Sequence, residues 1–123
     1  MPRAIMLAFT EPQDPSQDDE YNSWYDHKHL HDVVNVPGVV SATRYKLVQG
    51  IELLPGAQGV PQRYLAIYEI EGETEAEMAA FAEELKAALS DGRADIHMSM
   101  NMGTLGAAFG LPITDTLDSP NTR

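Results

Sequence analysis

Residues 20–45 read EYNSWYDHKHLHDVVNVPGVVSATRY, and this stretch decides the fold. Residues 20–35 place aromatic and polar side chains at the i, i+3, i+4 and i+7 positions of one helical face. Pro37 and Gly38 are residues that end helices. Residues 39–48 are rich in β-branched side chains and alternate in polarity, which is typical of a strand. The stretch therefore predicts a helix over 20–35, a sharp stop, and a strand over 39–48.

The predicted helix has an unusual inner face, because it is aromatic and histidine-rich where most helices carry leucine. Its members are Tyr21, Trp24, Tyr25, Lys28, His29, Asp32 and Val33. Such groups can stack on a flat molecule or move protons. We therefore look for the functional site here first.

Three more strands and a second helix complete the predicted fold. Residues 3–9 are apolar on both faces, as in a strand buried on both sides. Residues 62–70 alternate, and a last strand lies between 97 and 109. Thr74 and Glu77 form a capping box, which begins a helix that ends near residue 90 and carries an apolar stripe of Met78, Phe81, Leu85 and Leu89. The order β-α-β-β-α-β predicts an α+β, ferredoxin-like fold, with a four-stranded antiparallel sheet and two helices on one face.

One face of this sheet has no predicted cover. It would carry Val39, Tyr45, Leu47, Leu65 and Ile67, which would otherwise contact water. A second copy packed sheet to sheet is the simplest cover, so we expect a homodimer. The chain is expected to form one domain over 1–113, with a polar tail over 114–123. The loop over 49–61 is expected to be a lid or an oligomer contact.

Composition excludes several classes of function. The chain has 123 residues, a formal net charge of −11, only eight Lys and Arg, and no cysteine. Nucleic acid is not an expected partner, because phosphate binding needs clustered basic residues, and the same reasoning disfavours a membrane surface. The absence of cysteine excludes disulfides, thiol catalysis and Cys-ligated metals. The sequence shows no signal-peptide core and no run long enough to span a bilayer, so a cytoplasmic protein is expected.

A set of short motifs resembles a known family. These are Tyr21-Asn22-Ser23-Trp24-Tyr25-Asp26-x-x-His29-Leu30, Asp32-Val33, Val36-Pro37-Gly38-Val39 and Ala42-Thr43-Arg44-Tyr45. Together they resemble the EthD-like branch of the dimeric α/β-barrel superfamily, closely as far as residue 48 and beyond it only in the order and length of elements. The resemblance implies a dimer with a pocket near the first helix of each subunit. It does not imply one reaction, since relatives include isomerases, cofactor-free monooxygenases, cyclases, decarboxylases and haem-using enzymes.

His29 is the first candidate for chemistry. It matches the family's recurrent helix histidine, and imidazole titrates near neutrality, so it can take and return a proton. The alternative is a core histidine that bonds to backbone. Asp32 or Asp26 could orient it, and Tyr25 could polarise a substrate oxygen. Arg44 could hold an anionic substrate group, or pair within the protein with Asp32 or Glu69. The remaining expected substrate contacts are Tyr21, Trp24, Tyr64, Tyr68, His97 and Met98.

No metal or other cofactor is expected. His27 and His31 have the i, i+4 spacing that lets two imidazoles hold one ion, but no third ligand follows them. A haem would use His29 or His97 as an axial ligand, in a segment crowded by acidic residues. Nucleotide-binding glycine loops are absent from the sequence.

The sequence thus predicts a small cofactor-free enzyme that performs general acid/base chemistry on a small molecule. Isomerisation, dehydration or decarboxylation of a cyclic carbonyl, lactone or phenol would suit these residues. Two alternatives stay open. One is a cofactor-independent monooxygenase acting on a phenol, and the other is a non-catalytic dimeric protein that binds a small molecule.

Overall fold

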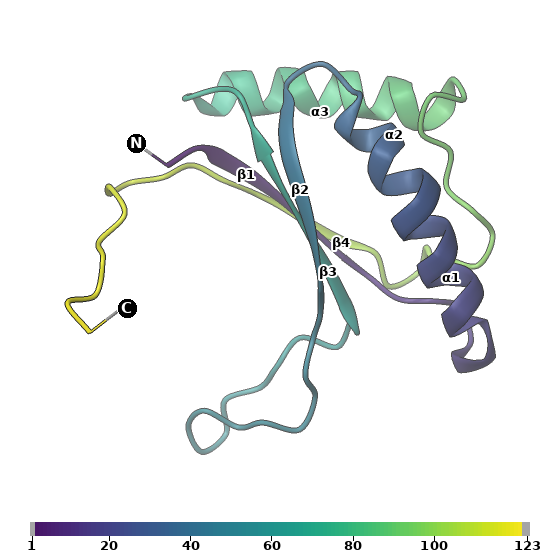
Figure 1. Ribbon diagram of the computed structural model, residues 1–123, viewed down its shortest axis with the longest axis horizontal. Coiled ribbons are helices and arrows are strands. Elements are labelled where there is room, and N and C mark those ends of the chain that lie inside the picture. Colours follow the sequence, from purple (N-terminus) through teal and green to yellow (C-terminus); the bar gives the residue numbers. More distant parts are fainter. Residues whose placement is uncertain (1, 122–123) are drawn as a thin grey trace.

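A four-stranded antiparallel sheet forms one layer of the molecule, with the strand order β2-β3-β1-β4. The computed structural model describes residues 2–121. Its strands are β1 (Ala4–Thr10), β2 (Val39–Lys46), β3 (Tyr64–Ile70) and β4 (Gly106–Gly110). The helices lie on one face of the sheet (Figure 1). The predicted α+β, ferredoxin-like fold is confirmed.

The first helix is continuous but contains one wide turn. A short 3₁₀ turn, η1 (Pro15–Gln17), leads into α1 (Asp18–Trp24), a π-helical turn η2 (Tyr25–His29) and α2 (Leu30–Val34). The buried side chains are Tyr21, Tyr25, His29 and Val33. They recur every four residues. In an ordinary α-helix, side chains four residues apart are rotated by about 40° from each other around the helix axis. The π turn contains the extra residue and keeps these four side chains on one face.

The π turn also corrects the predicted inner face. Lys28 is exposed, and its Nζ lies 2.7 Å from Oδ2 of Asp32. The prediction that these two residues face the sheet is therefore wrong. It assumed 3.6 residues per turn throughout, whereas the helix is wider at this point.

The second helix, α3 (Glu75–Ser90), begins as the sequence predicts. The Glu77 N–H donates to Oγ1 of Thr74 at 3.1 Å, and the Glu73 N–H donates to Oε1 of Glu77 at 3.0 Å. These two bonds satisfy N–H groups that a helix start leaves without partners. Met78 and Phe81 are buried, so the predicted apolar stripe faces the sheet.

The helix-facing side of the sheet is built from alternate residues of each strand. Met6 pairs with Tyr68, and Thr10 pairs with Tyr64. An irregularity between Val39 and Ser41 turns Val39 to this side, where it packs on the core. The prediction that Val39 lies on the uncovered face is wrong, because a bulge breaks the alternation of a strand.

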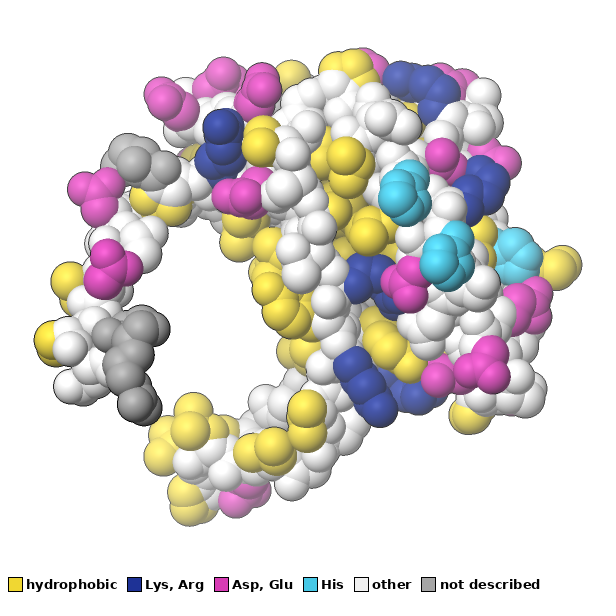
Figure 2. All heavy atoms as spheres, viewed as in Figure 1, with side chains coloured by type: hydrophobic (Ala, Val, Ile, Leu, Met, Phe, Trp, Pro, Cys, Tyr) yellow, Lys and Arg dark blue, Asp and Glu magenta, His cyan; other side chains and the backbone are white. Residues whose placement is uncertain are grey.

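The other side of the sheet, here called the open face, meets no element of residues 2–121. Its apolar residues include Ile5, Leu7, Phe9, Tyr45, Leu65, Ile67 and Ala108. Thr43, Ser41 and the exposed Glu69 lie on the same face, and the Ser41 hydroxyl donates to Oε1 of Glu69 at 2.7 Å. The segments 48–61 and 111–121 contain no helix or strand and extend on this side (Figure 1). Apolar side chains line the wall of the open hollow between them (Figure 2). Over residues 2–121, every helix is too short or too polar to cross a bilayer.

Candidate functional site

A partly open cavity of about 120 Å³ lies between the first helix, α3 and the sheet. Its walls are almost entirely apolar. They are formed by Met6, Ala8, Thr10, Tyr25, His29, Val33, Tyr68, Leu85, Leu89, Ile96, Met100, Leu105 and Ala107. An apolar cavity of about 150 Å³ can take up benzene, so this volume suits a single ring.

His29 supplies one of the few polar atoms of the cavity wall. Its side chain is only 5% exposed, and Nδ1 is buried with no hydrogen-bond partner among residues 2–121. Trp24 stacks on the ring at 4.6 Å between centroids, and Tyr25 meets it edge-on at 4.9 Å. These contacts hold the imidazole in place beside the cavity.

The same burial changes the acid–base behaviour of His29. Desolvation lowers its pKa from 6.5 to about 4, and the nearby backbone of Asp95 opposes this shift only in part. The expectation that this imidazole titrates near neutrality is therefore wrong, because a buried site disfavours the charged form. His29 is neutral at physiological pH and can accept a hydrogen bond or a proton.

This low pKa predicts a measurable pH dependence of stability. Between pH 6.5 and 4 the unfolded chain binds a proton that the folded chain rejects, so stability falls as the pH drops through this window. From pH 7 to pH 5 we expect His29 to account for a loss of about 2 kcal/mol in the free energy of unfolding. Urea unfolding at both pH values should show this loss in the wild type and in His31→Leu, but not in His29→Leu. Equal losses in both variants would contradict the neutral, buried state of His29.

Tyr25 and Tyr68 form the second polar feature of the wall. Their hydroxyl oxygens are 3.2 Å apart, and both side chains are 1% exposed. Burial raises the pKa of both phenols, so both keep their protons. When one hydroxyl donates to the other, the second still has a free proton. The pair can therefore donate one hydrogen bond to an oxygen in the cavity.

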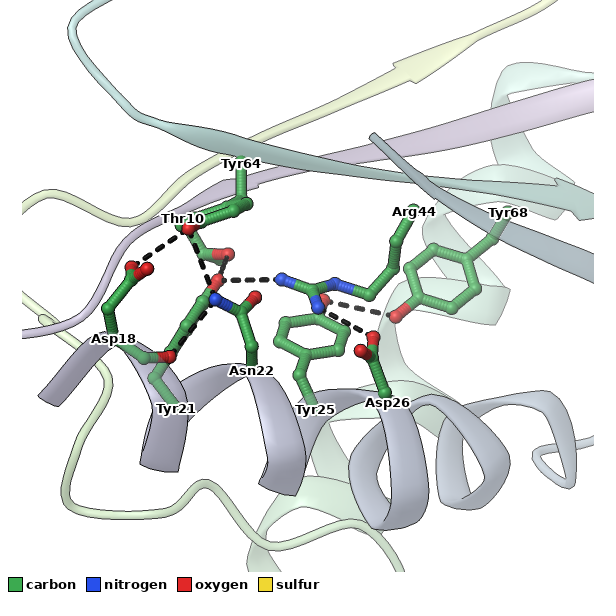
Figure 3. A network of polar contacts seen from close by, with 9 residues as sticks. All are labelled: Thr10, Asp18, Tyr21, Asn22, Tyr25, Asp26, Arg44, Tyr64 and Tyr68. Carbon is green, nitrogen blue, oxygen red and sulfur yellow. Dashed lines mark hydrogen bonds and ion pairs between the residues drawn. The ribbon is translucent and has the colours of Figure 1, made fainter. Parts of the chain in front are cut away.

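Arg44 lies behind the tyrosine wall rather than in the cavity (Figure 3). Its Nη1 lies 2.7 Å from Oδ1 of Asp26, and its guanidinium lies 4.2 Å from the centre of the Tyr25 ring. The Arg44 side chain is 11% exposed, against 50% for Asp26. Arg44 points at the helices, and its partner is neither of the predicted carboxylates, Asp32 or Glu69. The protein itself supplies the anion that a buried arginine needs.

Two more predicted contacts belong to this supporting network. Tyr21 bonds to the Thr10 hydroxyl, and its ring lies 5.4 Å from the Arg44 guanidinium. The Tyr64 hydroxyl donates to Asp18 at 2.8 Å (Figure 3). Neither tyrosine lines the cavity. They hold the first helix against the sheet and so position the residues that do line it.

The structure does not bring the predicted orienting carboxylates to His29. Asp32 is paired with Lys28, and Asp26 is paired with Arg44. His29 is held instead by ring contacts with Trp24 and Tyr25 and by the backbone of Asp95, whose hydrogen bond favours the protonated ring. Aromatic packing and this backbone contact take the place of the expected carboxylate–imidazole bond.

His97 and Met98 lie outside the cavity. The Ser99 N–H donates to Nδ1 of His97 at 3.1 Å, and the ring lies 5.7 Å from that of Trp24. Met98 is 76% exposed, and its neighbour Met100 lines the cavity in its place. The expected alternation fails because residues 97–101 form a turn and a bridge rather than a strand.

Several cavity residues were not predicted as site residues. They are Met6, Thr10, Leu85, Leu89, Ile96, Met100 and Leu105. Leu85 and Leu89 belong to the predicted apolar stripe of the second helix, where core packing is the usual role. An apolar stripe has the same sequence pattern whether its side chains line a cavity or fill a close-packed core.

A metal centre finds no support in the described chain. His27 and His31 are both exposed, and no three His, Asp or Glu side chains of residues 2–121 converge to hold an ion. The i, i+4 spacing alone therefore does not make a site.

Comparison with known proteins gives a likeness in fold. No protein-family model matches the chain, and no curated protein sequence matches it. An EthD-family protein from Bacillus halodurans superposes with a TM-score of 0.55 and 12% identity, covering 92% of this chain and 100% of that one. This chain has the fold of the EthD-type proteins. HapK from Hahella chejuensis has a TM-score of 0.51 at 15% identity, with coverage of 94% and 98%.

A third solved structure with the EthD-type fold contains ligands. It is an MhuD variant with two manganese protoporphyrin IX molecules bound per active site. The TM-score is 0.57 at 17% identity, and the match covers 94% of this chain and 99% of that chain. The comparisons thus confirm the fold that the sequence resemblance implied, and they include a protein of this fold that binds small molecules.

Proposed function

We propose that the chain is an acid/base enzyme for a single-ring, largely apolar molecule that carries a carbonyl or hydroxyl group. The observation that carries this proposal is the pairing of two polar features in one apolar cavity. The free Nδ1 of His29 can accept a proton, and the Tyr25–Tyr68 pair can donate a hydrogen bond. A cyclic enol, lactone or phenol offers matching groups.

The proposed chemistry uses each group in its resting state. The tyrosine pair bonds to the ligand oxygen and stabilises the negative charge that develops on it. Neutral His29 removes a proton from the ligand. The imidazolium formed is disfavoured by about 3 kcal/mol relative to water, from the shift of its pKa. The adjacent enolate or phenolate offsets this cost, and the same cost favours return of the proton to a new position.

Binding is the first test of this proposal. We expect phenol and a six-membered lactone to bind the wild type with a Kd between about 1 mM and 1 μM, by the free energy available per ligand atom. Ala8→Leu should fill the cavity and weaken binding at least about tenfold, because a close-packed cavity cannot take the ring. Calorimetry measures both, with Ala80→Leu on the exposed side of α3 as the matched control. Equal affinity in Ala8→Leu would place the ligand elsewhere.

A porphyrin does not suit this cavity. The volume of about 120 Å³ suits one ring, whereas the porphyrin macrocycle contains four linked pyrroles. The proposed reaction therefore uses no haem. The porphyrin bound by the MhuD variant belongs to that protein.

One observation favours a second candidate, a cofactor-independent monooxygenase on a phenol. Dioxygen is apolar, and an apolar cavity can take up apolar gases. Neutral His29 could remove the phenolic proton and leave an electron-rich anion. Oxygen uptake in the presence of the bound phenol distinguishes this reaction from isomerisation. Binding without any product would favour the non-catalytic protein instead.

We also propose that two copies pack through their open faces. Most side chains of this face are apolar, although it also carries Glu69, and nothing in residues 2–121 covers it. Exposed apolar patches of this kind mark protein interfaces. A two-fold dimer would bury the same residues of both subunits.

A further inference from the structure

Two segments frame the open face. We name residues 48–61 the loop arm and residues 111–121 the tail arm. The loop arm follows β2 and the tail arm follows β4, which are the two edge strands of the sheet. Both arms extend on the side away from the helices, with the apolar open face between them (Figures 1 and 2).

The arms carry the most exposed large apolar side chains of the described residues. Ile113 and Leu117 in the tail arm are each 95% exposed, and Leu53 in the loop arm is 87% exposed. Val48, Ile51 and Leu54 add to the loop arm. Single exposed leucines are ordinary, but such a concentration next to an uncovered sheet face indicates a shared contact surface.

The charge of the loop arm indicates what it contacts. Its sequence VQGIELLPGAQGVP contains one charged residue, Glu52, in a chain with a net charge of −11. Two copies with that charge repel each other, so they can meet only where few acidic residues lie. A basic partner would instead select for acidic side chains. The loop arm is therefore suited to an apolar surface on another copy of this acidic chain. The tail arm carries Asp115 and Asp118, so the charge argument applies to the loop arm, and the tail arm is included for its exposed Ile113 and Leu117.

We propose that the two arms of each subunit pack against the sides of a second copy, and that these contacts contribute a large part of the dimer's affinity. This inference rests on the open-face dimer proposed above. In a two-fold dimer both arms of each subunit contact the other subunit. One substitution in the chain therefore alters two symmetry-related contacts. The second copy is the occupant to which this proposal commits.

The test compares dimer affinity in double variants of each arm. Leu53→Ser with Leu54→Ser alters the loop arm, and Ile113→Ser with Leu117→Ser alters the tail arm. Met98→Ser with Met102→Ser is the matched control, since both methionines are exposed and lie outside the arms. Sedimentation velocity over a range of concentrations gives each Kd. We expect each arm variant to raise Kd at least about tenfold, as loss of buried apolar anchors does, and the control to match the wild type.

The outcomes separate this inference from the dimer itself. In one outcome, the arm variants keep the wild-type Kd while a charge on the open face breaks the dimer. In that case the arms do not contribute to dimer affinity, so this inference fails and the open-face dimer stands. If the wild type is monomeric, both proposals fail. A monomer that sediments with phosphatidylcholine vesicles would assign the arms to a lipid surface, and this too would overturn the proposal.

Discussion

Replacing His29 with alanine is expected to lower kcat by about 10²–10⁴ on the cyclic substrate, the usual contribution of a general base. Nδ1 of His29 is the proposed proton acceptor, and the variant leaves the Tyr25–Tyr68 pair in place. Ligand binding should therefore change less than turnover. The wild-type kcat/KM should fall as the pH drops through about 4, because protonation of His29 removes the base.

The control for this prediction is His31→Ala, which removes an exposed histidine from the same helix. It should keep wild-type turnover. A well-folded His29→Ala variant with unchanged kcat would remove His29 from the mechanism. An acidic limb near pH 6.5 in the kcat/KM profile would show that the reactive base is a solvated group and not this buried imidazole.

Replacing Tyr45 with glutamate is expected to raise the dimer Kd at least about 100-fold, because a buried unpaired carboxylate is costly. Tyr45 lies on the open face, in register with Leu65, and is 49% exposed in the single chain. Across a two-fold interface the substitution brings two negative charges into an apolar contact. Native mass spectrometry and sedimentation velocity should show monomer at concentrations where the wild type is dimeric.

Met98→Glu serves as the matched control, since it adds the same charge at an exposed apolar position away from the open face. It should leave the dimer intact. If Tyr45→Glu dimerises as tightly as the wild type, the open face is not the interface. The cavity and its chemistry would be unaffected by that result.

The first helix shows what a spacing rule can predict and where it fails. A wheel of 3.6 residues per turn places Tyr21, Tyr25 and His29 inside, and the structure agrees. It also places Lys28 and Asp32 inside, and they are not. The four-residue spacing of Tyr21, Tyr25, His29 and Val33 is the sequence feature that indicates the π turn, since only a wider turn keeps such a repeat on one face.

The strand ends and the polar partners were less accessible to sequence reasoning. In the sequence, Val39 fits the alternation of its strand. The bulge is seen only in the register between β2 and its partner strand β3. Arg44 and Asp26 are far apart in sequence and meet because the first helix crosses β2 at this level. Which carboxylate reaches a buried arginine depends on that crossing, and sequence spacing does not define it.

The cavity itself was the hardest feature to predict. Its position near the first helix was implied by the family resemblance, and Tyr25, His29 and Tyr68 were named. Its other walls come from apolar residues such as Leu85 and Met100, whose sequence pattern is that of ordinary core. A cavity is the small volume that packing leaves unfilled, so it depends on the exact sizes of side chains from every element.

The central claim is that neutral His29 meets a ring ligand inside this cavity. Its most direct test is ¹⁵N NMR of the imidazole nitrogens, recorded at pH 7 with and without saturating phenol. We predict that His29 gives the two distinct nitrogen signals of a neutral ring, and that phenol shifts the Nδ1 signal of His29 while those of His27 and His31 stay in place. A charged His29 at pH 7, or shifts confined to the exposed histidines, would contradict the claim.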